Sequence, residues 1–200
     1  MQRTKTAVGS IAILLVILIG SLFFITLSTT VHATLFRELT NAVPLQQRQI
    51  VDSAVVQFLQ HRKSLSAELF TDREIAHMGD VRGIFDGLGL LWFAAVALLT
   101  PFIHSRTLHN RSVYKILRGA LVLLPLLAVS AIFFFEPLFV TMHELLFHND
   151  YWQLDPTVSV LIRVYDEIFF QTFAGLWFAI VWFALVCIVW LLHKNLEKEQ

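Results

Sequence analysis

Four long apolar runs alternate with polar connections along the chain. The runs cover residues 7–28, 84–103, 119–140 and 169–192. A helix needs about 20 apolar residues to cross the hydrocarbon core of a bilayer, because each residue adds about 1.5 Å. The pattern therefore predicts four transmembrane helices in a single membrane domain, 1–200.

The first apolar run also resembles a signal peptide, because Arg3 and Lys5 precede it and residues 31–33 resemble a cleavage site. Its 22 residues exceed the roughly 7–15 apolar residues that are usual in a signal peptide. We therefore expect this run to be an uncleaved membrane anchor.

Two long connections, 29–83 and 141–168, hold much of the polar sequence and are expected to form a small cap. Residues 29–36 are rich in β-branched and apolar types, which is compatible with a short strand. Apolar residues recur at helical spacing from Ile50 to Leu59, and predict an amphipathic helix that lies on the membrane or packs in the cap. The run 158–164 fits either a strand or a helix. The predicted fold is an all-α membrane protein with four transmembrane helices and a mainly helical cap.

Lysine and arginine are distributed unevenly over the connections. Residues 1–6, 104–118 and 193–200 hold eight of them in 29 positions, whereas 29–83 and 136–168 hold seven in 88. Short loops that are rich in these residues tend to face the cytoplasm. We therefore expect both termini to be cytoplasmic and the cap to be extracytoplasmic.

The overall composition excludes several classes of function. The chain has 15 basic and 15 acidic residues and is 56% hydrophobic, so it lacks the basic excess that binds nucleic acid. Its single cysteine, Cys187, lies in an apolar run, which excludes a disulfide framework and a cysteine-based metal cluster. No nucleic acid partner is expected.

The first polar motif immediately precedes the second apolar run. Thr71 and Glu74 have the spacing of a capping box, which predicts that a helix begins here and continues into the membrane. On such a helix Glu74 and Asp80 each lie three positions from His77, so either carboxylate could orient the imidazole. The alternative is a solvated, charged helix entry at the level of the lipid head groups.

The second polar motif follows the third apolar run and contains His143, Glu144 and His148. A zinc-binding pair on a helix needs histidines at positions i and i+4, but these are at i and i+5. The extra residue rotates one imidazole by roughly 140° from the other, so a shared metal would require a break in the helix. Tyr151 and Trp152 follow this motif, where aromatic residues are also typical of a membrane interface.

The two motifs are expected at the same depth. His77 lies seven residues before the second run, and His143 lies eight residues after Phe135, where the third run ends if its extension through Val140 is left out. In continuous helices both imidazoles would stand roughly 10–12 Å beyond the apolar runs, where lipid esters are presented. His32 and His61 lack comparable acidic and aromatic neighbours in the sequence and are not selected.

At these two motifs the sequence resembles the bacterial lipoprotein intramolecular transacylase family, Lit. The matching residues are Glu74, Ile75, His77, Met78, Asp80 and Val81, then His143, Phe147, Trp152, Asp155 and Pro156, and finally Leu161, Ile162, Arg163, Phe169 and Phe170. The resemblance covers essentially the whole chain, including the number of spans and the loop lengths. It implies a multi-pass protein of the bacterial plasma membrane with its active site at the extracytoplasmic interface.

The resemblance also implies an acyl transfer within one substrate molecule. The substrate is a diacylated lipoprotein, held in membrane lipid by the diacylglyceryl group on its N-terminal cysteine. The sn-2 acyl chain moves to the α-amino group of that cysteine, which yields the lyso-form lipoprotein. The resemblance implies that His77 and His143 are catalytic, without a cofactor, a covalent intermediate or an obligate protein partner.

The remaining candidate residues would bind or orient the substrate. Tyr151 and Trp152 could form walls of the site. Arg163 could stabilise an oxyanion, or could simply pair with Asp155 or Glu167. The sequence leaves open how the two histidines would divide the roles of acid and base.

Two other classes of function stay open at this point. The first is a non-catalytic assembly or interaction subunit, which would use the apolar face between Ile50 and Leu59 to bind an envelope protein. The second is a metal-dependent membrane hydrolase, which would use His143, Glu144 and His148 as the centre of its site.

Overall fold

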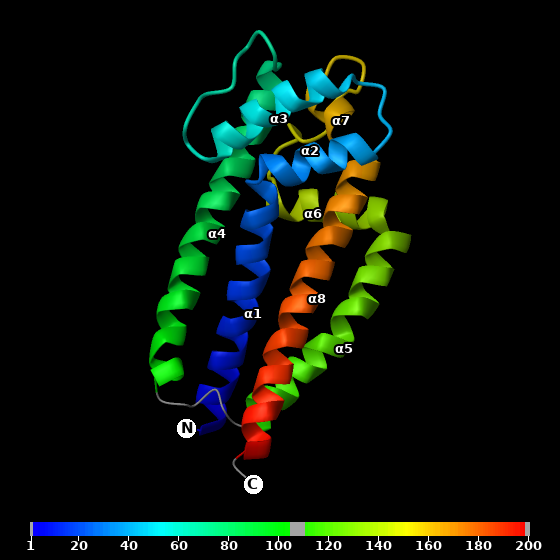
Figure 1. Cartoon of the computed structure of the whole chain (residues 1–200). Helices are drawn as coiled ribbons and strands as arrows, with labels where there is room; N and C mark the ends of the chain where they lie inside the picture. The colour runs from blue at the N-terminus through cyan, green and yellow to red at the C-terminus, as the bar shows by residue number, and fades with distance from the viewer. Residues whose placement is uncertain (1, 105–110, 199–200) are drawn as a thin grey trace. The chain divides into compact units, whose positions relative to one another are not determined.

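A computed structural model describes residues 2–104 and 111–198 of the chain. These residues form helices and connecting loops, with no strand in the described ranges. The helices are α1 Gln2–Thr26, α2 Thr29–Glu38, α3 Leu45–Leu59, α4 Asp72–His104, α5 Arg111–Phe133, α6 Phe135–Leu146, α7 Val160–Val164 and α8 Glu167–Lys198 (Figure 1). Part of the predicted cytoplasmic linker, at 105–110, lies outside the described residues.

Four of the helices are long and apolar enough to cross a membrane. The qualifying segments are Thr4–Thr26, Asp72–Phe102, Arg111–Phe133 and Glu167–Lys198. Together with the helical content of the described residues, they confirm the all-α membrane fold class. The third segment differs in detail from its prediction, because α5 ends at Phe133 and a separate helix, α6, begins at Phe135.

The chain divides into two compact units, which we describe separately. Unit 1 comprises residues 1–22, 88–131 and 175–200, and unit 2 comprises 23–87 and 132–174. Unit 1 is made from the long helices alone, and unit 2 contains the shorter helices as well as the adjoining ends of the long ones.

Unit 1 is held together by apolar packing and by tryptophan hydrogen bonds. Its core comprises Val113, Leu117, Val181, Leu185, Val189 and Leu192. Trp177 donates its indole N–H to the Leu18 carbonyl at 3.1 Å and to Ser21 Oγ at 3.0 Å. Trp92 donates to the Val16 carbonyl at 3.1 Å. A Cβ added at Gly20 would lie 3.0 Å from the Trp92 indole nitrogen, so the small residue permits this close approach.

Unit 2 has its own core, to which α2, α3 and α7 contribute. The α3 helix contacts both α2 and α7 (Figure 1). Its predicted amphipathic segment is confirmed as a helix, and Val51, Val55 and Phe58 are buried in this core. The apolar face that motivated an interaction subunit is therefore largely used inside the protein, although Ile50 remains exposed.

Two local predictions are resolved by the structure. Residues 29–36, which were compatible with a strand, lie in helix α2, and Ser28 caps this helix by accepting a hydrogen bond from the Val31 amide. The strand expectation was therefore wrong, because an N-cap and the burial of His32 and Phe36 outweigh the strand preference of β-branched residues. Within 158–164, residues 160–164 form the short helix α7.

The predicted capping box is confirmed at the start of α4. The Thr71 amide donates to Glu74 Oε2 at 2.7 Å, and the Glu74 amide donates to Thr71 Oγ1 at 3.3 Å. This reciprocal pair satisfies two backbone donors that would otherwise lack partners at the helix start. It fixes where α4 begins, and thereby the position of His77 within the second turn.

Candidate active site

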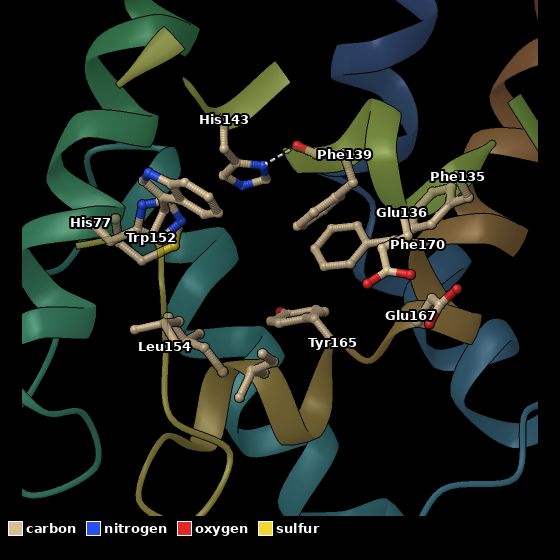
Figure 2. Close-up of a pocket in the computed structure, with 13 residues that line it drawn as sticks. His77, Phe135, Glu136, Phe139, His143, Trp152, Leu154, Tyr165, Glu167 and Phe170 are labelled. Atoms are coloured by element: carbon tan, nitrogen blue, oxygen red, sulfur yellow. Dashed lines mark hydrogen bonds between the residues drawn. The ribbon is translucent and has the colours of Figure 1, made fainter. Parts of the chain in front are cut away.

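A cavity of about 250 Å³ lies within unit 2 (Figure 2). Its walls come from α4, α6 and α7, from the segments before and after α7, and from the start of α8. The lining residues are His77, Met78, Phe135, Glu136, Phe139, His143, Trp152, Leu154, Leu161, Ile162, Tyr165, Glu167 and Phe170. The cavity is mainly aromatic and aliphatic, with the two predicted histidines in its wall.

His77 reaches the cavity from α4. The residue is only 9% exposed, and its Nδ1 is buried without a hydrogen-bond partner among the described residues. Its ring lies 6.0 Å from the His143 ring and meets Phe147 edge-on at 5.1 Å, measured between centroids. Buried polar atoms usually have partners, so this free nitrogen is available to a ligand in the cavity.

His143 reaches the same cavity from the last turn of α6. Its Nδ1 lies 2.7 Å from the Phe139 carbonyl oxygen, as Figure 2 shows. Because a carbonyl can only accept, Nδ1 carries the proton and Nε2 of the neutral ring has the free lone pair. Burial lowers the pKa of the His143 imidazole, against the opposing effect of the Phe139 hydrogen bond. The ring is therefore held neutral near pH 7, in a state that can accept a proton.

Aromatic rings fix the orientation of the His143 imidazole. The Phe139 ring lies at 4.1 Å and the Trp152 ring at 5.0 Å from it, between centroids. Neither His77 nor His143 forms an ion pair with a carboxylate among the described residues. The two imidazoles therefore form a neighbouring pair without the acidic partner of a hydrolase triad.

Trp152 belongs to residues 147–159, a segment that we call the strap. Arg73 on α4 donates to the Asp150 carbonyl and pairs with its carboxylate at 3.2 Å. Asp80, also on α4, accepts a hydrogen bond from the Asn149 amide nitrogen at 2.9 Å. Asp80 was one of two carboxylates that could orient the His77 imidazole, and in the structure its hydrogen bond is to Asn149 of the strap that carries Trp152.

Tyr151 and Trp152 have different surroundings despite their adjacency. Tyr151 is 42% exposed and its ring lies 5.9 Å from the Arg73 guanidinium carbon. It is not among the cavity residues, whereas Trp152 is. Of these two predicted wall residues, the structure thus places only Trp152 in the wall.

Glu74 is fully buried and joins α4 to α7. Its Oε2 accepts from the Thr71 amide and hydroxyl, and its Oε1 accepts from the Ser159 hydroxyl at 2.6 Å and the Leu161 amide at 2.8 Å. None of these bonds involves His77. The carboxylate therefore holds the end of the strap and the start of α7, which contributes Leu161 to the cavity.

Asp155 and Arg163 lie outside the cavity wall. Asp155 accepts hydrogen bonds from the Thr157 amide and hydroxyl, both at 2.8 Å, and these bonds lower the pKa of its carboxyl. Arg163 donates from Nε to the Ser159 carbonyl at 3.0 Å. Both residues shape the strap and α7, and no ion pair joins Arg163 to Asp155 or Glu167 within the described ranges.

Several cavity residues were not selected from the sequence. Phe139 could have been found, because it lies four positions before His143 and so shares its helix face. Glu136 and Glu167 occur in the first turns of α6 and α8, where acidic residues are common for electrostatic reasons. Tyr165 carries no local signal, since only the fold brings it to the wall.

The structure also corrects the assessment of His32 and His61. His32 Nδ1 lies 2.6 Å from Asp52 Oδ1, and its ring packs against three phenylalanines, including Phe169 at 5.7 Å between centroids. His61 Nε2 lies 2.8 Å from Asp86 Oδ1. Both histidines have acidic partners from distant parts of the sequence, which local sequence context could not reveal.

The three residues that suggested a metal site do not share one environment. His143 is buried in the cavity wall, whereas Glu144 and His148 are exposed. Helix α6 ends at Leu146, between the two histidines. Among the described residues, no group of three or more His, Cys, Asp and Glu side chains is arranged to hold a metal ion.

Comparisons with known proteins bear on this site and on the whole chain. A family model described as lipoprotein intramolecular transacylase Lit matches residues 6–170. No curated protein matches the chain.

Solved structures also resemble the chain. One is the in meso structure of the membrane integral lipoprotein intramolecular transacylase Lit from Bacillus cereus, with 19% identity and a TM-score of 0.76 over 100% of this chain and 97% of that chain. Two variants of that protein, with a histidine replaced by arginine or by alanine, match at 18% identity with TM-scores of 0.77 and 0.76. They cover 93% and 95% of their own chains and all of this one. At these identities the likeness shows a common fold.

Proposed function

The chain belongs to the lipoprotein intramolecular transacylase family Lit, and on this premise we propose that it converts diacylated lipoproteins to the lyso form. The sn-2 acyl chain of the diacylglyceryl group moves to the α-amino group of the N-terminal cysteine in the same molecule. The observation that carries this proposal is the pair of buried imidazoles in one apolar cavity, His77 and His143, 6.0 Å apart between ring centroids.

The proposed reaction requires the transfer of two protons from the attacking nitrogen. An α-amino group is largely protonated at pH 7, since its pKa is roughly 8. When the C–N bond forms and the ester C–O bond breaks, the nitrogen loses two protons in total. One proton goes to the departing glyceryl oxygen, and the other leaves the site. Two neighbouring imidazoles can hold and pass these protons without a metal or a covalent intermediate.

The hydrogen bonds of His143 favour it as the first proton acceptor. Its Nδ1 is committed to the Phe139 carbonyl, so the free lone pair is on Nε2. The lowered pKa keeps this ring neutral at the pH at which the ammonium must be deprotonated. His77 supplies the second imidazole, and its unpartnered Nδ1 is free to contact the substrate.

The apolar cavity makes a second contribution to catalysis, because its walls orient the amine and the ester toward each other. Amine and ester belong to one molecule, so a wall that folds the lipid head back on itself converts the reaction into a well-oriented encounter. Effective molarities of roughly 10⁵ to 10⁸ M are reached by intramolecular reactions with good orientation. The rings of Trp152, Phe139 and Phe170 are suited to this task.

We further propose that the site faces the extracytoplasmic side of the plasma membrane. The support is the distribution of lysine and arginine, which are concentrated in the terminal segments and the connection 104–118. This orientation would put His77 and His143 at the level where the diacylglyceryl esters of a lipoprotein lie.

The test is the conversion of a synthetic diacylated lipopeptide by the purified full-length protein. The transfer adds and removes no atoms, so tandem mass spectrometry must locate the acyl chain on nitrogen or on glycerol. We expect N-acylated, S-monoacylglyceryl product from the wild type, and a loss of at least roughly 10²-fold in rate for His77→Ala and His143→Ala.

Controls separate this function from its alternatives. His193→Ala is the matched control, because His193 lies in α8, pairs with Glu197 and does not line the cavity. Release of free fatty acid would indicate a hydrolase, and an unchanged lipopeptide would contradict the transacylase. Full conversion by the folded His77 and His143 variants would contradict their assigned roles.

A further inference from the structure

A second polar network is buried in unit 2, and the proposed mechanism does not use it. His32 Nδ1 and the Tyr165 hydroxyl both bond to the same atom, Asp52 Oδ1, at 2.6 and 2.8 Å. The side chains of His32 and Asp52 are 5% and 4% exposed. These three residues come from α2, α3 and the turn before α8, so the fold alone brings them together.

Tyr165 connects this network to the cavity. It belongs to the cavity wall, as Figure 2 shows, whereas Asp52 and His32 do not. Burial, and secondarily the Asp52 carboxylate, raise the pKa of the Tyr165 phenol well above its ordinary value. The phenol therefore remains protonated and donates its hydrogen to Asp52, a residue that does not line the cavity.

The orientation of Tyr165 matters for the chemistry of the cavity. A hydroxyl turned into an apolar site would compete for the ester carbonyl and would draw water toward it. Water at the ester would convert acyl transfer into hydrolysis. The aromatic ring, whose centroid lies 5.1 Å from that of Phe169 and 6.3 Å from that of Phe170, offers none of these contacts.

We propose that Asp52 is a positioning residue that holds Tyr165 with its ring, and not its hydroxyl, toward the acyl substrate. His32 supports this role, because its Nδ1–H bond fixes the Asp52 oxygen that Tyr165 uses. The inference rests on the proposed transacylase function and specifies how one wall of that site is maintained. It assigns no contact between substrate and either Asp52 or His32.

The proposal makes a specific prediction for substitutions at Asp52. Asp52→Asn keeps an oxygen that can accept both bonds, so we expect activity within a few-fold of the wild type. Asp52→Leu leaves both the Tyr165 hydroxyl and His32 Nδ1 without their acceptor, and buried donors without a partner force a rearrangement. A displacement of about 1 Å can cost roughly 10²-fold in rate, and we expect at least about a tenfold loss.

The decisive variant is the double substitution Asp52→Leu with Tyr165→Phe. It removes the hydroxyl that has lost its partner, so we expect the phenyl ring to return to the cavity wall. The rate of N-acylation should then be at least about fivefold higher than that of Asp52→Leu. Because removal of a buried unpaired hydroxyl also restores stability, the ratio of hydrolysis to transfer and the melting temperature are compared in the same variants. Tyr114→Phe is the matched control, because Tyr114 stacks on His193 and does not line the cavity.

The measured quantities are the rates of N-acylation and of fatty acid release from one diacylated lipopeptide, together with the melting temperature of each full-length variant. Support for the proposal is a higher ratio of hydrolysis to transfer in Asp52→Leu that falls again in the double variant. Unchanged transfer in Asp52→Leu, or no recovery in the double variant, would overturn it. Absence of N-acylation by the wild type would instead overturn the proposed function.

Discussion

At the residue scale, the two imidazoles of the cavity differ in the hydrogen bonding of their Nδ1 atoms. In His143 this nitrogen is bonded to the Phe139 carbonyl, and in His77 it has no partner among the described residues. A buried His143 ring of lowered pKa is a proton acceptor at neutral pH. The two imidazoles of the cavity thus differ in hydrogen bonding, and only the His143 ring has its tautomer fixed by a backbone carbonyl.

The pH dependence of the reaction follows from His143. Its pKa lies below the ordinary value of about 6.5, so the ring stays neutral as the pH falls through that value. We expect the acidic limb of the kcat/KM profile to lie below pH ~6.5. Fixed-time assays of lipopeptide conversion at a series of pH values would measure this limb. A limb above this value would contradict a lowered pKa in the free enzyme.

The lowered pKa of His143 also makes the free energy of unfolding depend on pH. Because the folded state lowers the pKa of His143, the unfolded chain binds a proton more readily between the two pKa values. The contribution of His143 to stability is therefore complete above about pH 6.5 and falls as the pH decreases toward the folded pKa. Melting temperatures across this range should show a smaller loss on acidification for His143→Gln than for the wild type.

At the element scale, three polar residues of α4 act together on the strap. Arg73 and Asp80 bond to Asp150 and Asn149 of the strap, and Glu74 holds Ser159 at its end. The strap in turn places Trp152 against His143. A helix that contributes His77 thereby also positions the residue that packs on the second histidine.

Glu74 should be the most important of these residues for stability. Glu74→Ala would leave the Leu161 amide and the Ser159 hydroxyl without their acceptor in a buried region. We expect a loss of roughly 2–4 kcal/mol of unfolding free energy, because groups that bond to a buried charge are costly to leave unpaired. Thermal unfolding in detergent would measure it, with the exposed Glu68→Ala as the matched control.

Arg73 should affect substrate binding more than stability. Its side chain is 41% exposed, and exposed ion pairs contribute roughly 0–1 kcal/mol. Arg73→Gln would loosen the strap near Trp152, so we expect a higher KM with a small change in melting temperature. The wild-type KM should rise toward that of the variant at high salt, since salt screens the pair. Arg37→Gln on α2 is the control, because within the described part of the chain Arg37 bonds only to residues of its own helix.

At the scale of the whole molecule, the uneven distribution of charged residues predicts an orientation in the membrane. The segments expected in the cytoplasm are short and dense in lysine and arginine, whereas the connection 29–83 and the segment 136–168 are longer and hold more acidic residues. The charges balance in number over the chain, 15 against 15, but not between the two sides. This asymmetry predicts that the cavity opens to the extracytoplasmic side.

Cysteine labelling tests this orientation directly. The chain has one cysteine, so Cys187→Ala provides a background for single introduced cysteines. In intact cells, we expect a membrane-impermeant maleimide to label Ser66→Cys in the cap connection. Glu197→Cys near the C-terminus should be labelled only after the membrane is permeabilised. The reverse pattern would place the active site in the cytoplasm.

The sequence contained most of the information about class and local structure. Apolar runs of sufficient length predict membrane-spanning helices, because a bilayer imposes one length on every crossing segment. The capping box at Thr71 and Glu74 was predictable because its two bonds join residues three positions apart. Residues 29–36 were less predictable, since a cap and tertiary burial decide between helix and strand in so short a segment.

Only the tertiary structure decided which residues share a site. It brought His77 and His143, which were expected at the same depth, to one cavity, and it placed Tyr151, Asp155 and Arg163 outside the cavity wall. It also joined His32 to Asp52 and both to Tyr165, although these residues are far apart in the sequence. Local patterns encode helix faces and caps, whereas contacts between distant segments depend on how all the helices of unit 2 pack at once.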